Sequence, residues 1–92
     1  MLSVLNEWRP AGRPDIIAVD RRRHVVYALE QVIGTRMTKL LAIGQRVICR
    51  GVFSCDYDAA CRAAAEMLWQ QKVEFTDPVA SNVAEERRWQ NN

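Results

Sequence analysis

The segment 46–68, RVICRGVFSCDYDAACRAAAEML, changes its hydrophobic period in the middle, and this change constrains the fold more than any other feature. Up to Phe53 the pattern alternates, as in a β-strand with one buried face. From Asp56 onward the apolar residues recur at helical spacing, and aspartate is a good helix N-cap. The sequence therefore predicts a strand that leads directly into a helix ending near Gln71. The stripe expected to pack on the sheet consists of Tyr57, Ala60, Cys61, Ala64, Met67 and Leu68.

The residues before this helix have the pattern of a β-hairpin around Gly44-Gln45. A glycine at the first of two turn positions is typical of a type II′ turn. Pairing across such a turn sets Lys39 opposite Arg50, on a face that also carries Leu41, Ile43, Arg46 and Ile48. The other face is apolar and is expected to face the core: Leu40, Ala42, Val47, Cys49 and Phe53.

Two earlier segments, 15–20 and 24–32, are predicted to pair as strands. The second also fits a helix, because Val25, Leu29 and Val32 have helical spacing. We prefer the strand, since a helix beginning at Asp20 would carry three arginines in its first turn, against the helix dipole. In the hairpin, Arg21, Arg22 and Arg23 form an exposed turn.

Shorter elements are expected toward the two ends of the chain. KVEF, residues 72–75, has the pattern of a short strand. Asp77 suits an N-cap and Pro78 the first position of a helix. Residues 2–9 have the spacing of a short amphipathic helix.

These elements predict an α+β fold: a small antiparallel sheet of three to four strands, one long helix packed across it, and short terminal helices. A length of 92 residues indicates a single domain spanning 1–92. We expect an ordered core at about 15–76, with 1–14 and 77–92 as helical or flexible ends. The core of so small a domain is modest, which leaves homodimerisation open as a source of stability.

Several functional classes lack support in the sequence. The single histidine, His24, lies beside the arginine-rich turn, where neighbouring positive charges oppose its protonation. Cys49, Cys55 and Cys61 are six residues apart, unlike the close pairs of zinc sites, and suit buried or free thiols. No apolar run approaches the roughly 20 residues needed to cross a bilayer. We therefore expect a non-catalytic cytoplasmic protein without metal, cofactor or membrane partner.

The basic residues provide the leading functional hypothesis, a small regulatory protein that binds double-stranded DNA. The formal charge is +2, and arginine supplies most of the positive charge. A two-stranded ribbon fits the DNA major groove, where arginine contacts guanine and phosphate. The predicted DNA-binding residues are Arg21, Arg22, Arg23, Arg36, Lys39, Arg46 and Arg50.

The tryptophans support an alternative hypothesis, a protein-interaction or inhibitor module. Tryptophan and arginine are enriched at the energetic centres of protein interfaces. Trp69, Arg62 and Trp89 would then contact an acidic protein partner. Such a module would suit an accessory protein of a mobile genetic element such as a phage or plasmid.

Residues 46–75 also resemble the second half of the apetala/ethylene-response-factor type of DNA-binding domain, whose plan is shared by integrase arm-binding domains. The resemblance lies in a Gly-x-Phe element followed by an alanine-rich helix, at Gly51, Phe53, Ala59, Ala60 and Ala63. It implies a three-stranded antiparallel sheet with a helix across it. Because the sheet of that family enters the major groove, it also implies DNA-facing roles for Arg46 and Arg50.

Overall fold

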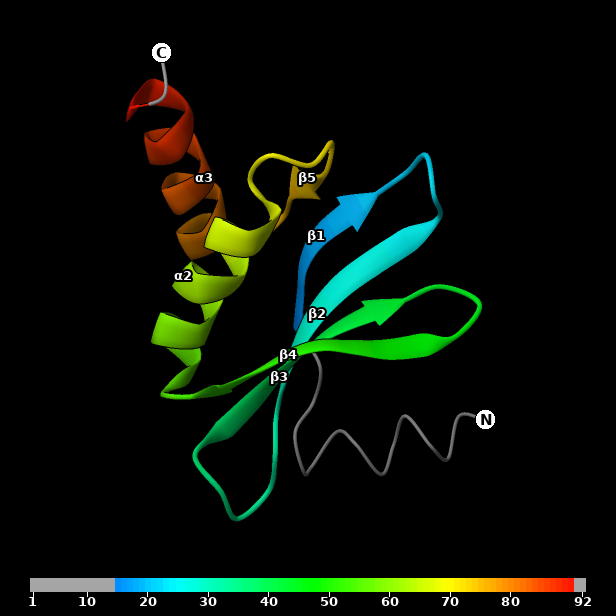
Figure 1. Ribbon diagram of the computed structural model, residues 1–92, viewed down its shortest axis with the longest axis vertical. Helices are drawn as coiled ribbons and strands as arrows, with labels where there is room; N and C mark the ends of the chain where they lie inside the picture. Colours follow the sequence, from blue (N-terminus) through cyan, green and yellow to red (C-terminus); the bar gives the residue numbers. More distant parts are fainter. Residues whose placement is uncertain (1–14, 91–92) are drawn as a thin grey trace.

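The computed structural model describes residues 15–90, which form an antiparallel sheet and two helices (Figure 1). In chain order the elements are β1 (Asp15–Asp20), β2 (Val25–Gln31), β3 (Met37–Ile43), β4 (Val47–Ser54), α2 (Tyr57–Leu68), β5 (Glu74–Phe75) and α3 (Pro78–Gln90). The strand order is β4-β3-β2-β1-β5, and all pairs are antiparallel. The predicted α+β class is confirmed. The sheet has five strands rather than three or four, because the two-residue β5 adds to the outer side of β1.

The core lies between α2 and one face of the sheet. Ala60 and Ala64 are fully buried on the helix, and Leu29 and Leu40 are fully buried on the central strands. Alanine has only a methyl group, so the helix can approach the sheet closely, and each buried leucine contributes about 1.5–3 kcal/mol by leaving water. The predicted stripe is confirmed apart from Met67, which is 45% exposed and lies over Gly51 of β4.

The helices differ from the prediction of one long helix with short terminal helices. α3 has 13 residues and α2 has 12, so the two are of similar length. α3 lies beside α2 (Figure 1) and buries Ala80, Val83 and Ala84. The length of α3 was not predicted because its sequence has only a thin apolar stripe. Its buried face is formed mainly by small residues that pack on α2. The helix predicted at 2–9 lies outside the described residues.

One carboxylate joins the two helices. Asp77 Oδ1 accepts hydrogen bonds from the backbone N–H groups of Val79 and Ala80, at 2.9 and 3.1 Å, which is the capping role predicted for it. The thiol of Cys61 on α2 donates to the same oxygen at 3.0 Å. Burial and this hydrogen bond raise the pKa of Cys61 to about 12. The start of α3 is thereby fixed against the middle of α2.

The β3–β4 hairpin differs from its predicted register. Ile43 pairs with Val47, so the loop contains three residues, Gly44 to Arg46, instead of two. A shift of one residue moves side chains to the other face of a strand. Val47 and Cys49, expected in the core, are therefore exposed on the sheet face opposite α2.

A β-bulge at Arg50 reverses this shift farther along β4. Leu41 pairs with Cys49 and Leu40 pairs with Gly51, so Arg50 is an additional residue without an opposite partner. Beyond the bulge Phe53 lies on the core face, as predicted, and packs against the core. Arg50 consequently lies on the α2 side of the sheet, while Lys39 lies on the opposite face.

The three cysteines provide a test of this register. We expect Cys49 to react rapidly with a thiol reagent at pH near neutrality, because it is exposed. Cys61 should remain unreactive until the protein unfolds, because it is buried and its raised pKa keeps the thiol protonated. Peptide mapping after labelling of native protein measures both. Protection of Cys49 in monomeric, folded protein would support the two-residue turn instead.

Candidate functional site

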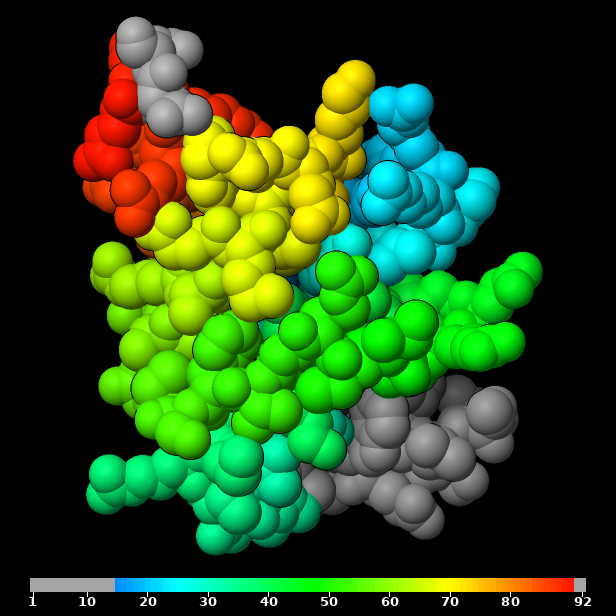
Figure 2. Space-filling view, in the orientation of Figure 1, coloured from blue at the N-terminus to red at the C-terminus, as the bar shows by residue number. Residues whose placement is uncertain are grey.

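Two loops that are distant in sequence lie at the same end of the sheet. The turn between β1 and β2, residues 21–24, and the β3–β4 loop, residues 44–46, both extend away from the helices (Figure 1). In Figure 2 they form adjacent projections, coloured blue to cyan and green, on one side of the molecule. The first loop carries three arginines and the second carries Arg46, so this arrangement brings together two basic segments that are distant in sequence.

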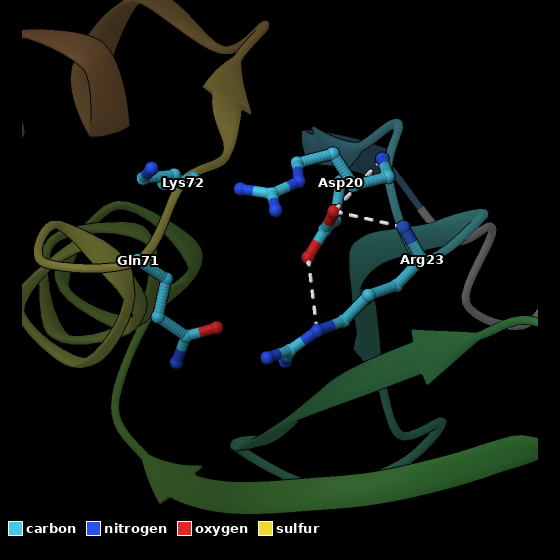
Figure 3. A pocket seen from close by; sticks show the side chains of 5 residues that line it. Asp20, Arg23, Gln71 and Lys72 are labelled. Atoms are coloured by element: carbon cyan, nitrogen blue, oxygen red, sulfur yellow. Dashed lines mark hydrogen bonds and ion pairs between the residues drawn. The ribbon is translucent and has the colours of Figure 1, made fainter.

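The β1–β2 turn is organised by a buried carboxylate. Asp20 is 5% exposed, and its Oδ1 accepts hydrogen bonds from the backbone N–H groups of Arg22 and Arg23, both at 3.1 Å. Its Oδ2 lies 3.9 Å from Nε of Arg23 (Figure 3). His24 completes the turn with φ of 57°, a left-handed conformation that histidine tolerates better than most residues. The turn thus has a defined form that presents its arginines to solvent.

The β3–β4 loop lies directly against this turn. A methyl group at Gly44 would be 3.4 Å from the carbonyl oxygen of His24 and 3.4 Å from Cγ2 of Val25. The β3–β4 loop and the start of β2 are thus in close contact at Gly44. This contact keeps Arg46 near the arginines of the β1–β2 turn.

Two hollows open around these loops and together are lined by five cationic side chains. The first has a volume of about 360 Å³ and lies between the β1–β2 turn and the end of α2 (Figure 3). Its lining residues are Asp20, Arg22, Arg23, Gln71 and Lys72. The second has a volume of about 510 Å³ and lies between the two loops. Its lining residues are Arg23, His24, Val25, Tyr27, Ala42, Gly44, Gln45, Arg46, Ile48 and Arg50.

The charge of these hollows is strongly positive. Among residues 15–90, the five cations are Arg22, Arg23, Arg46, Arg50 and Lys72, and the one acid in the two linings is Asp20. The carboxylate of Asp20 is already engaged by the turn and by Arg23. The surface can therefore hold an anion that several guanidinium groups contact at once.

The other predicted DNA-binding residues lie outside the two hollows. Nε of Arg21 is 2.9 Å from Oε1 of Glu74, so its charge is compensated. Arg36 lies in the β2–β3 turn, at the opposite end of the sheet. Lys39 pairs with Glu30 on the face opposite α2. Partial burial raises the pKa of Glu30, and the charge of Lys39 opposes this rise.

The residues of the alternative, protein-binding hypothesis lie near carboxylates or are partly buried. Nε of Arg62 contacts Oδ2 of Asp58 at 3.0 Å. Trp89 is 74% exposed and lines a shallow hollow with Glu85 and Glu86. Trp69 is half-buried at the end of α2. An exposed tryptophan beside two carboxylates does not complement an acidic partner.

Sequence reasoning did not single out several residues that line the hollows, among them Tyr27, Ile48, Gln71 and Lys72. Gln71 and Lys72 follow α2 and carry no pattern of their own, and only the fold places them opposite the β1–β2 turn. Ile48 was expected on the same face as Arg46 and Arg50, and it does line the second hollow with them. The alternation of side chains along the strand was therefore the sequence feature that could have identified Ile48.

Other classes of site receive no support from the part of the chain that the structure describes. Within residues 15–90, no cluster of three or more histidine, cysteine, aspartate or glutamate side chains could hold a metal ion. Neither α2 nor α3 combines the length and apolar character needed to cross a membrane.

Comparisons of the chain with protein-family models, curated proteins and solved structures give no match. The resemblance to the apetala/ethylene-response-factor type of domain thus stays a prediction. The site is interpreted from its own geometry.

Substitution of Asp20 tests how the β1–β2 turn is held. Asp20→Ala removes the acceptor of two backbone N–H groups, and we expect the free energy of unfolding to fall by about 1–3 kcal/mol. Asp20→Asn keeps one acceptor oxygen and should lose less than half of that amount. Urea denaturation of the two variants and the wild-type protein measures the difference. Equal losses would show that the charge, rather than the hydrogen bonds, holds the turn.

Proposed function

We propose that the protein is a non-catalytic nucleic-acid-binding module, with DNA as its ligand. The concave surface formed by the β1–β2 turn, the β3–β4 loop and the segment after α2 would contact the phosphate backbone. The observation that carries the proposal is the convergence of five cationic side chains on two hollows that share Arg23, with the carboxylate of Asp20 already engaged. Phosphate contacts by arginine and lysine dominate the affinity of most DNA-binding proteins.

The proposed mode of contact differs from the insertion of a free β-ribbon. β3 is an inner strand that pairs with β2, so the hairpin does not stand apart from the sheet. Arg50 and Lys39 lie on opposite faces, and they cannot contact one groove from the same side of a ribbon. Loop arginines that grip the backbone fit the arrangement better.

The protein-interaction alternative has weaker support. It relies on Trp69, Arg62 and Trp89, of which Arg62 is paired with Asp58 and Trp89 is flanked by glutamates. Those surroundings would favour a basic partner over the acidic one first considered.

Salt dependence tests the proposal. With four to five phosphate contacts, the affinity for DNA should fall by about two to three orders of magnitude between about 50 and 200 mM salt. Arg46→Gln/Arg50→Gln should weaken binding and reduce the slope of log K against log salt by about 1 to 2. Fluorescence anisotropy with labelled DNA measures both quantities.

The matched control is Arg36→Gln/Lys39→Gln, which changes the net charge equally at two predicted residues outside the hollows. We expect its salt slope to remain within about half a unit of the wild-type value. An equal reduction by both pairs would rule out the concave surface as the specific site. Folded protein that does not bind DNA at low salt would rule out the proposed function.

A further inference from the structure

The two basic hollows differ in chemistry although they share Arg23. The first is lined by polar and charged side chains. The second has basic side chains and an apolar group, which consists of Val25, Tyr27, Ala42 and Ile48. They are also linked below the surface, because the hydroxyl of Tyr27 donates to Oε1 of Gln71 at 3.4 Å. A cationic site therefore adjoins an apolar one.

The apolar part of the second hollow is a consequence of where α2 ends. α2 stops at Leu68, and its Met67 covers Gly51 of β4. Ile48, on the same side of β4 and nearer the β3–β4 loop, is 53% exposed. The sheet face that forms the core therefore extends beyond α2 and is exposed to solvent at Ile48. Arg46 and Arg50 line the same hollow as this exposed part of the face.

This combination discriminates between forms of nucleic acid. A duplex presents phosphates and groove edges to a protein, while the flat faces of its bases are stacked inside. An unpaired nucleotide presents both a phosphate and the apolar face of a base. The second hollow, at about 510 Å³, is within the size range of small-molecule sites and is large enough for a base.

We propose that this surface binds single-stranded nucleic acid in preference to duplex. The inference rests on the proposed function and specifies its ligand. A phosphate lies in the first hollow, against Arg22, Arg23 and Lys72. The neighbouring base lies over Ile48, and the guanidinium group of Arg46 or Arg50 packs on it, as arginine does on unpaired bases.

The first experiment compares ligands of equal length on wild-type protein. Labelled single-stranded and duplex DNA of about 12 nucleotides, a length within the range of known single-strand sites, are titrated by fluorescence anisotropy at low salt. We expect the single strand to bind at least about tenfold more tightly, the effect of seating one base. A single-stranded RNA of matching sequence distinguishes DNA from RNA as the source of the ligand, because the 2′-hydroxyl is the one difference in the sugar.

The second experiment tests where the base binds, by substitution of two neighbouring residues of β4. Ile48→Ala should weaken single-strand binding about fivefold to tenfold and leave the salt slope unchanged, because no phosphate contact is lost. Val47→Ala is the matched control, since Val47 is 49% exposed but lies on the opposite face. It should bind as the wild type does. Circular dichroism confirms that both variants are folded.

The outcomes separate this inference from the proposed function. If neither form of DNA nor the single-stranded RNA binds to the folded protein at low salt, both are wrong. If duplex binds as tightly as the single strand or more tightly, the inference is overturned and the proposed function stands. An unchanged affinity in Ile48→Ala, with the single-strand preference intact, would overturn the assignment of the base to the apolar hollow.

Discussion

The packing of α2 on the sheet is the contact on which the rest of the structure depends. Ala60 and Ala64 bring the helix close enough to bury Leu29 and Leu40 completely. α2 also supports α3, through the hydrogen bond from Cys61 to the carboxylate of Asp77. α2 follows directly on the end of β4 and lies at that end of the sheet, so the end with the two loops extends beyond the helix (Figure 1).

The candidate site occupies that open end. Two loops lie side by side there because β2 and β3 pair as far as Val26 and Ile43, and Asp20 fixes the form of the first loop. The segment after α2 adds Gln71 and Lys72 from the other side (Figure 3). Positive charge accumulates at this place because three separate parts of the chain each supply cations and the enclosed carboxylate is engaged. A cationic surface next to exposed apolar side chains suits a ligand that is itself both anionic and apolar.

Local signals were reliable where the physical cause is local. Asp56 caps α2, with Oδ1 accepting the backbone N–H of Ala59 at 2.8 Å, and Asp77 with Pro78 begins α3 as predicted. β2 confirms the prediction of a strand, rather than a helix, at 24–32. The physical reason is that three arginines suit a turn better than the N-terminus of a helix. The register of β4 could not be obtained in this way, since turn length and a bulge each change which face a residue occupies.

The sequence by itself determined the α+β class, the start of α2 and α3, and the three arginines in the turn between β1 and β2. These depend on period, capping and turn chemistry, which act over a few residues. Tertiary structure decided which cations meet. The extra residue in the β3–β4 loop and the bulge at Arg50 separate Lys39 from Arg50, and strand pairing brings Arg23 and Arg46 to one end of the sheet. The face that a strand residue occupies, and the loops that lie beside it, depend on pairing between distant segments. A local sequence pattern therefore does not predict them.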